Sequence, residues 1–316
     1  MIYQHLFCGV IGFERRIITQ TSNFTWMRMK SPRTNAALLL TALAAMIGLT
    51  STVSAAAGEM NMDTGLPAHL YDASGAVDGL AMLTYFLFFV GYIAMGAAFV
   101  FFMSERNNVA KEYRTTMTIS ALIVGIAAFH YYYMRGVYAD YGVVSIEYRY
   151  MDWIITVPLM ALKFPSLVGK DAITDEKFLG LGFTGVCFSG AIIMILFGYL
   201  GEAGIMNGLL GLVLGGVGWA MIIVATGTPF SSGKGVDNSK IKDELQWSVN
   251  ALRSFIVFGW IIYPIGYLFN PTADILPDAV SAEIMAVLYN IADVINKVGF
   301  GIVAWMGAKK ASAAMA

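Results

Sequence analysis

The chain has 316 residues, of which 58% are hydrophobic and 13% charged, and its net charge is −1. Globular domains carry about 25% charged residues, so this composition predicts an integral membrane protein. A pI near 6.3 provides no basic face for nucleic acid. The cysteines and histidines share no ligand spacing, so the sequence predicts neither a disulfide framework nor a metal site. These residues are Cys8, Cys187, His5, His69 and His130.

The first 57 residues are predicted to be an upstream extension followed by a cleavable secretory signal. Basic residues between Arg28 and Arg33 precede the apolar run 36–49, and residues 53–57 form a small-residue cleavage site. An uncleaved signal anchor is the alternative, and both interpretations place residue 58 outside the membrane. The candidate start codons encode Met1, Met27 and Met29.

Seven apolar segments follow, each close to the ~20 residues that a bilayer-spanning helix requires. Their expected bounds are 78–103, 115–138, 147–169, 177–200, 205–227, 246–269 and 280–308. The sequence therefore predicts an all-α bundle of seven transmembrane helices at 78–310, after an outer segment at 58–77 and before a tail at 311–316. Residues 139–145 are β-prone, and a short β-hairpin could form there between the second and third helices.

Basic residues gather in the connections on one side of the predicted bundle. The opposite connections, 58–78, 201–204 and 270–281, contain no lysine or arginine. The positive-inside rule therefore predicts that the mature N-terminus is outside and the C-terminus cytoplasmic. The basic residues are Arg106, Lys111, Arg114, Lys170, Lys177, Lys234, Lys240, Lys242, Lys309 and Lys310.

Ionisable residues occur deep inside the third segment, where inserting a charge costs about 2.5 kcal/mol or more. At 100° per residue, Arg149, Thr156 and Lys163 lie within about 60° of Asp152, so all four face roughly one way. Because this helix is expected to run inward, Lys163 lies about 16 Å cytoplasmic of Asp152. The alternative for Lys163 is a side chain that snorkels to the cytoplasmic interface.

The seventh segment carries Asp293 and Lys297 one helical turn apart, with Asp293 about 6 Å outward. Asp152 at a similar depth would give the lysine a second carboxylate, and Arg149 would complete its outer shell. A buried lysine can form a Schiff base with a carbonyl compound, and the protonated imine then needs a carboxylate counter-ion. A purely structural ion pair is the alternative.

Other side chains can reach the same region. His130 of the second segment is either a titrating partner of the carboxylates or a hydrogen-bonded packing residue. Trp153, Trp260 and Tyr263 form either an apolar slot for a ligand or ordinary bundle core.

Four strings of residues occur in order along the predicted helices. They are His130-Tyr131 with Tyr133-Met134-Arg135-Gly136, Arg149-Tyr150-Met151-Asp152-Trp153 with Thr156-Val157-Pro158, Trp260-Ile261-Ile262-Tyr263-Pro264, and Tyr289-Asn290-Ile291-Ala292-Asp293-Val294-Ile295-Asn296-Lys297. These strings resemble the microbial rhodopsins, most closely the proteorhodopsin-like proton pumps, over about residues 78–310. The resemblance implies a retinal protein of the bacterial inner membrane that is not an enzyme, exchanges protons, contacts lipid and forms homo-oligomers.

The resemblance also implies roles for particular residues. Lys297 would bind all-trans retinal as a protonated Schiff base, with Asp152 as primary proton acceptor and Asp293 as second counter-ion. Arg149 would be the modulating arginine and His130 the partner of Asp152. The remaining implied site residues are Thr156, Trp153, Met160, Trp260, Tyr263 and Pro264. Met160 occupies a colour-tuning position, where an apolar side chain resembles the green-absorbing type.

Lys163 departs from the family pattern, because many of these pumps have a carboxylate at this position and only a few have lysine. The favoured interpretation is a light-driven outward proton pump with Lys163 as candidate proton donor. Chloride pumping is disfavoured because Asp152 keeps a carboxylate, and sodium pumps resemble a different motif. Two alternatives remain: a photosensor that signals through a partner protein, and a seven-helix protein without a chromophore.

Overall fold

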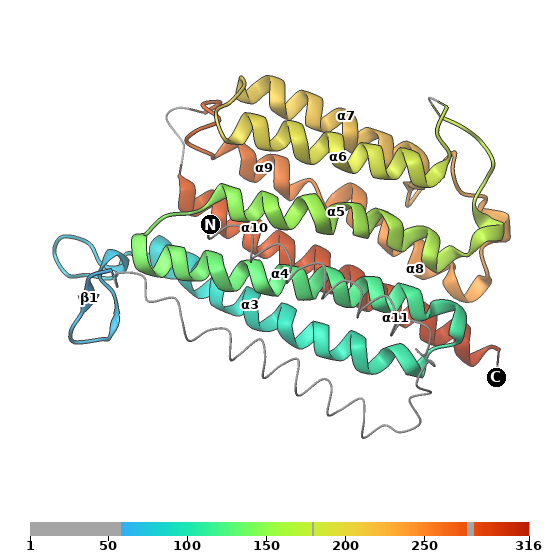
Figure 1. Cartoon of the computed structure of the whole chain (residues 1–316), viewed down its shortest axis with the longest axis horizontal. Coiled ribbons are helices and arrows are strands. Elements are labelled where there is room, and N and C mark those ends of the chain that lie inside the picture. Colours follow the sequence, from blue (N-terminus) through green and yellow to red (C-terminus); the bar gives the residue numbers. More distant parts are fainter. Residues whose placement is uncertain (1–57, 179, 277–280, 316) are drawn as a thin grey trace, which may run out of the picture. The chain divides into compact units, whose positions relative to one another are not determined.

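The computed structural model describes residues 58–178, 180–276 and 281–315, so the expected extension and signal lie outside the described residues. Within these ranges seven helices are long and apolar enough to cross a membrane, which confirms the all-α seven-helix fold (Figure 1). The first five are α3 (Gly79–Glu105), α4 (Arg114–Tyr141), α5 (Ile146–Val168), α6 (Phe183–Glu202) and α7 (Gly208–Thr226). The sixth combines α8 (Asp243–Ser254), η8 (Phe255–Gly259) and α9 (Ile262–Leu268). The seventh combines α10 (Ala282–Asp293), η9 (Val294–Gly299) and α11 (Phe300–Ala313).

Short elements occupy the connections. Strand β1 (Met60–Asn61) pairs antiparallel with β2 (Leu66–Pro67), and β3 (Gly227–Thr228) pairs antiparallel with β4 (Ser231–Ser232). Single 3-10 turns are η3 (Ala68–Leu70), η4 (Arg106–Asn108), η5 (Lys111–Tyr113), η6 (Lys170–Ala172) and η7 (Asn238–Lys240). The strand pairs therefore lie before α3 and between α7 and α8.

The hairpin expected at residues 139–145 is wrong. Helix α4 continues to Tyr141, and Gly142 ends it in the left-handed conformation, with φ 65° and its N–H bonded to the Tyr138 carbonyl. Ser145 already caps α5. Too few residues remain between the two helices for a pair of strands, so the β-prone valines form a plain connection.

The helices that begin at the β1–β2 end of the bundle share a local signal. A side-chain oxygen of the residue before each helix accepts a backbone N–H of the first turn, which satisfies a donor that lipid could not. The capping residues are Asp78 for α3, Ser145 for α5, Asn207 for α7 and Ser281 for α10. The first, third, fifth and seventh helices therefore run in the same direction, as Figure 1 shows.

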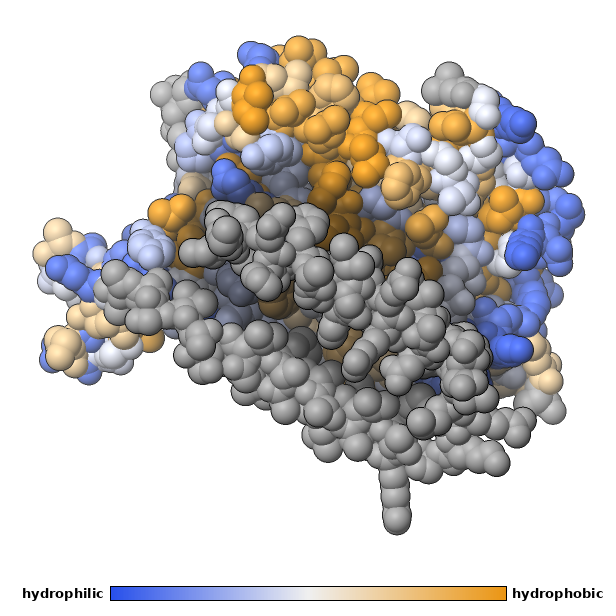
Figure 2. Space-filling view, in the orientation of Figure 1, coloured by the Kyte–Doolittle hydropathy of each residue, from blue (hydrophilic) through white to orange (hydrophobic). Residues whose placement is uncertain are grey.

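Helices α6 and α7 pack closely through glycines. A Cβ atom on Gly218 would lie 2.6 Å from the backbone nitrogen of Met194, and one on Gly211 would lie 2.8 Å from the Phe197 carbonyl oxygen. Small residues permit such close approach in membranes. Figure 2 shows a hydrophobic surface over α6 and α7, which is the kind of surface that contacts lipid. Its exposed side chains on α7 are Leu209, Leu210, Val213, Val217 and Val224.

Candidate functional site

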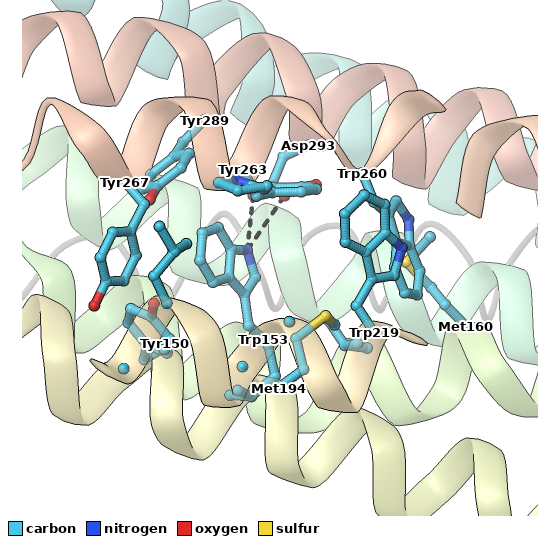
Figure 3. Close-up of a pocket in the computed structure, with 18 of the residues that line it drawn as sticks. Tyr150, Trp153, Met160, Met194, Trp219, Trp260, Tyr263, Tyr267, Tyr289 and Asp293 are labelled. Atoms are coloured by element: carbon cyan, nitrogen blue, oxygen red, sulfur yellow. Dashed lines mark hydrogen bonds between the residues drawn. The ribbon is translucent and has the colours of Figure 1, made fainter. Parts of the chain in front are cut away.

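An apolar cavity of about 310 Å³ lies within the bundle, where α5, α6, α7, the sixth helix and the seventh helix meet (Figure 3). Its volume falls in the range of small-molecule sites. The residues that the sequence assigned to a ligand pocket all line it: Trp153, Met160, Trp260, Tyr263 and Pro264. Asp293 and Lys297 line it as well, so a buried amine and a carboxylate open onto an apolar space.

Trp153 of α5 joins the cavity wall to the buried charges. Its Nε1 donates to Asp293, at 3.2 Å and 3.3 Å from the two carboxylate oxygens (Figure 3). Its ring meets the rings of Tyr263 and Tyr289 edge-on, each at a centroid distance of 5.1 Å. A hydrogen bond and two aromatic contacts therefore fix the orientation of this indole.

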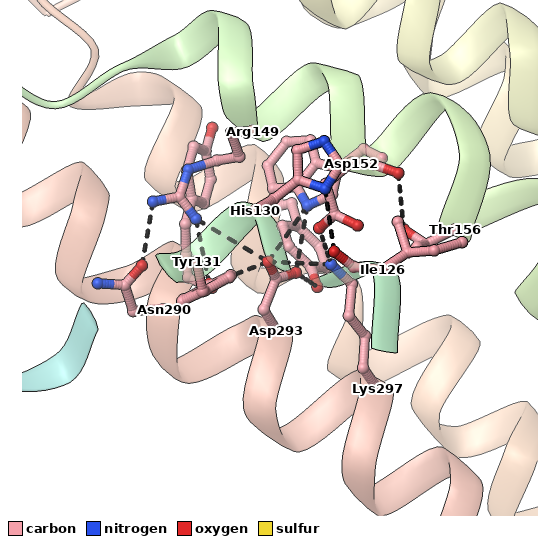
Figure 4. A network of polar contacts seen from close by, with 12 residues as sticks. Ile126, His130, Tyr131, Arg149, Asp152, Thr156, Asn290, Asp293 and Lys297 are labelled. Carbon is pink, nitrogen blue, oxygen red and sulfur yellow. Dashed lines mark hydrogen bonds and ion pairs between the residues drawn. The ribbon is translucent and has the colours of Figure 1, made fainter. Parts of the chain in front are cut away.

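Lys297 forms ion pairs with two carboxylates, and all three side chains are at most 1% exposed. Its Nζ contacts Oδ2 of Asp152 from α5 and lies 3.2 Å from Oδ2 of Asp293, one turn earlier in its own helix (Figure 4). Each buried charge thereby gains an opposite partner. The structure brings together the lysine and the two acids, as expected if Asp152 lies at the depth of Asp293.

The two carboxylates are bonded unequally. Asp293 accepts hydrogen bonds from Tyr263 Oη at 2.7 Å and Tyr131 Oη at 2.9 Å, besides the one from Trp153. Oδ1 of Asp152, in contrast, is buried without a hydrogen-bond partner among the described residues. Because donors stabilise a carboxylate charge, the protein stabilises the charge of Asp293 more than that of Asp152.

Arg149 is fully buried beside Asp293. Its Nη1 lies 3.9 Å from Oδ2 of Asp293 and donates to Tyr131 Oη at 3.3 Å. Its Nη2 donates to Oδ1 of Asn290 at 3.0 Å, and the guanidinium carbon lies 5.2 Å from the centre of the Tyr289 ring. The arginine is therefore held at one place in the bundle by an anion, two neutral acceptors and an aromatic face.

His130 and Thr156 contact backbone rather than the carboxylates. Nδ1 of His130, which is half-buried, lies 3.0 Å from the Ile126 carbonyl of its own helix (Figure 4). Within the described residues it has no hydrogen bond to Asp152. Thr156 Oγ1 donates to the Asp152 carbonyl at 3.1 Å. The partnership of His130 with Asp152 stays a prediction, and Thr156 supports the helical turn that carries Asp152.

Lys163 of α5 is fully buried, so the alternative of snorkelling to the interface is wrong. Its Nζ lies 4.8 Å from the centre of the Phe300 ring and has no hydrogen-bond partner among the described residues. In the described part of the chain this amine faces an aromatic ring rather than a hydrogen-bonding group. The lysine therefore stands apart from the Lys297 network.

Several residues of this region carry contacts that sequence reasoning did not assign. They are Tyr131, Tyr289, Asn290, Trp219, Asn296 and Glu202. Glu202 is fully buried at the end of α6, where Tyr289 Oη donates to it. Its position directly after an apolar segment made it look like a loop residue. The two tyrosines and two asparagines lie in the quoted strings, and the helical phase of Tyr289, Asn290 and Asn296 relative to Asp293 was a usable signal.

Comparisons with known proteins agree with this geometry. A family model described as bacteriorhodopsin-like protein matches residues 82–311. The chain is 36% identical over 220 residues to the green-light absorbing proteorhodopsin of Gamma-proteobacterium EBAC31A08, covering 69% of this chain and 84% of that protein. It is 35% identical over 219 residues to the blue-light absorbing proteorhodopsin of Gamma-proteobacterium Hot 75m4, covering 69% and 83%. Xanthorhodopsin, a light-driven ion pump with dual chromophore, has a similar structure, with a TM-score of 0.62, 27% identity and coverage of 75% and 96%. The chain therefore belongs to the bacteriorhodopsin-like family of microbial rhodopsins, and it is a multi-pass membrane protein rather than an enzyme.

Proposed function

We propose that the protein is a light-driven outward proton pump that carries all-trans retinal as a protonated Schiff base on Lys297. The observation that carries this proposal is the buried Lys297 amine, paired with Asp152 and Asp293 at the edge of an apolar cavity. The similarity to xanthorhodopsin, which is described as a light-driven ion pump, supports the same function.

The residues around Lys297 fit retinal. The cavity is large enough for a small apolar ligand and is lined by Trp153, Trp260 and Tyr263. Lys297 supplies an amine for covalent attachment, and two carboxylates balance its positive charge. When bound, retinal supplies the absorption of visible light and a change of shape that drives the cycle.

Asp152 is proposed as the proton acceptor and Asp293 as the second counter-ion. Oδ1 of Asp152 is free of hydrogen bonds within the described residues, so it can take a proton without losing a donor. Protonation of Asp293 would weaken the charge-assisted hydrogen bonds that it accepts from Tyr131, Tyr263 and Trp153. The unequal bonding therefore favours Asp152 as the group that changes its protonation state.

Arg149 and His130 complete the outer side of the proposed pathway. The fixed Arg149 cation lies beyond Asp293 and repels a proton that would move back toward it. His130 is proposed to act on Asp152 through its charge, because no direct bond joins them in the described residues.

Lys163 is proposed as the proton donor from the cytoplasmic side. An amine that is neutral at rest can take a proton from the cytoplasm and pass it toward Lys297. Its burial beside Phe300 agrees with a donor that is loaded only when the inner half of the bundle opens. Lys163 follows Asp152 by about three turns of α5 and Asp152 contacts Lys297, so the proposed donor and acceptor lie at different depths, which supports the proposed direction.

Colour is proposed to be green, because Met160 places an apolar side chain in the cavity wall. A polar group there would add a dipole beside the chromophore. The green and blue proteorhodopsins are almost equally similar to this chain, at 36% and 35% identity, so overall similarity does not decide the colour.

Topology and assembly complete the proposal. Residues 78–310 form the retinal-binding domain, with 58–77 outside, 311–316 in the cytoplasm and 1–57 acting as extension and signal. The protein is placed in a bacterial inner membrane, as a homo-oligomer that exchanges protons and binds no metal.

The test is to illuminate retinal-supplied cells that make the full chain and to record the external pH. The pump predicts acidification that a protonophore abolishes, and Asp152→Asn should remove it. A visible absorption band without acidification would transfer the assignment to a photosensor. Absence of any visible band after retinal addition would contradict the retinal protein itself.

A further inference from the structure

Two wide helical turns lie next to each other beside the cavity. In the sixth helix, Phe255–Gly259 is π-helical, and in the seventh, Val294–Gly299 is π-helical and contains Lys297. Such turns are rare, concentrate at functional sites and disturb the regular ladder of backbone hydrogen bonds. A buried carbonyl that loses its helical donor needs another partner.

Two side chains from neighbouring helices supply donors to the wide turn of the sixth helix. Trp219 of α7 donates from Nε1 to the Ile256 carbonyl at 2.8 Å. Asn296, the residue before Lys297, donates from Nδ2 to the Gly259 carbonyl at 2.9 Å. Asn296 is fully buried, so its amide is available for this contact rather than for water. The wide turn is thus tied to α7 on one side and to η9 on the other.

Gly259 is shaped to receive Asn296. A Cβ atom on Gly259 would collide with Oδ1 of Asn296 and lie 3.2 Å from its Cγ. Its next neighbour would be Cδ1 of Phe255 at 3.5 Å, which is an ordinary contact. Position 259 therefore needs glycine because of Asn296 alone.

The backbone hydrogen bonds around this turn depart from the regular helical pattern. The Trp260 N–H donates to the Phe255 carbonyl at 3.0 Å, and the Tyr263 N–H donates to the Trp260 carbonyl at 3.2 Å. Pro264 has no N–H to contribute. The stretch Phe255–Pro264, called the hinge below, is therefore where the sixth helix bends most easily.

The hinge also covers the candidate proton donor. Phe255, its first residue, packs edge-on against Phe300 with ring centroids 6.1 Å apart. Phe300 is the ring that lies 4.8 Å from Lys163 Nζ. A swing of α8 about the hinge would therefore shift the aromatic pair that covers Lys163.

We propose that Asn296 is a positioning residue, whose bond to Gly259 ties the turn carrying Lys297 to the hinge and resists bending of the sixth helix there. This inference rests on the proposed pump for its role in the proton cycle. The tie itself is a property of the chain in the dark, so it can be tested separately.

The first test is hydrogen–deuterium exchange of the full-length protein in the dark. Asn296→Ala removes one hydrogen bond that holds the hinge, so exchange over residues 255–262 should rise about five- to tenfold. Gly259→Ala displaces the same amide and should have the same effect, which keeps the test usable if Asn296→Ala does not fold. Gly96→Ala is the matched control, because a Cβ there meets nothing within 4 Å.

Pairs of substitutions give the sharper result. The effects of Gly259→Ala and Asn296→Ala should not add, since the alanine at 259 fits once Asn296 is gone. The effects of Gly259→Ala and Trp219→Phe should add, because they free different carbonyls. Exchange within a factor of two of the parent in both single variants, or additivity of the first pair, would overturn the proposal.

The functional readout is the light-driven proton signal of retinal-supplied protein in vesicles. Asn296→Ala should change the rate of the proton-uptake phase several-fold and leave the release phase as in the parent. A merely structural role would lower thermal stability and leave the ratio of the two rates unchanged. Failure of pumping in the parent would refute the proposed function but leave the exchange result standing, so the two failures are distinguishable.

Discussion

The two sides of Lys297 are built differently. Toward the β1–β2 end, Asp152, Asp293, Arg149 and Tyr131 are joined by ion pairs and hydrogen bonds (Figure 4). Toward the other end, Lys163 Nζ faces the Phe300 ring and has no polar partner in the described part of the chain. One half is a polar network, and the other half is apolar and aromatic.

This contrast would set the direction of the proposed proton transport. In the proposed pump, a proton that leaves Lys297 toward the β1–β2 end would meet a carboxylate in contact. A proton that arrives from the opposite end would meet the rings of Phe300 and Phe255 beside Lys163. The proposed cycle would therefore require the Lys163 end of the bundle to move.

The largest expected effect comes from removing the group that both halves serve. Lys297→Ala deletes the amine of the cavity, so retinal addition should produce no visible band and illumination no pH change. The measurement is the absorption spectrum of the purified protein after reconstitution. Lys163→Met should keep the band and serves as control. A retained band in Lys297→Ala would show that the chromophore is attached elsewhere.

Exchange of each carboxylate for its amide should separate the roles of the outer pair. Asp152→Asn should lower the initial pumping rate at least ~100-fold, because the proton acceptor is lost. Asp293→Asn should instead destabilise the fold by about 3 kcal/mol, since Arg149 and three donors lose a buried anion. Pumping assays and thermal unfolding of both variants check this. Equal effects in the two assays would contradict the asymmetry.

The apolar half is tested through the amine of Lys163. Lys163→Met keeps the length and apolar stem of the side chain but cannot carry a proton. The uptake phase should slow by about ten- to 100-fold while the release phase stays as in the parent. Flash photolysis with a pH-indicator dye measures both. An unchanged uptake rate would rule out Lys163 as donor.

The polar half was largely predictable from the sequence, and the apolar half was not. Helical periodicity placed Asp293 one turn from Lys297 and Asp152 on one face with Arg149, whereas the pairing of Asp152 with Lys297 was expected from the family resemblance and an assumed similar depth. Hydropathy placed the helices for the same reason, since each has to span the bilayer by itself.

What the sequence did not predict depends on how helices rotate against one another. The bond from Asn296 to Gly259 joins two helices through a wide turn, and neither residue type signals such a turn. Glu202 is buried and accepts a hydrogen bond from Tyr289 of another helix. Contacts between segments set these features, and the period of a single segment does not report them.

The smallest expected effect concerns residues 58–77, called the cap below, which precede α3 at the polar end of the bundle. His69 packs edge-on against Tyr138, and burial lowers the pKa of its imidazole below the ordinary 6.5, against an opposing attraction from Glu283. The folded cap therefore binds a proton less readily than the unfolded chain does. The stability that His69 contributes is complete above pH 6.5 and is lost as the pH falls through 6.5 toward the lower folded pKa.

Hydrogen–deuterium exchange over residues 58–77 should consequently increase modestly between about pH 7.5 and pH 5, after correction for the intrinsic pH dependence of exchange. His69→Gln keeps a polar side chain of similar size that does not titrate, and it should flatten this pH dependence. Residues 255–262 of the hinge are the internal reference, because the described histidines, His69 and His130, lie in other elements. If exchange at 58–77 and at 255–262 responds alike to pH, the effect is global, and the polar and apolar halves are less independent than their contacts indicate.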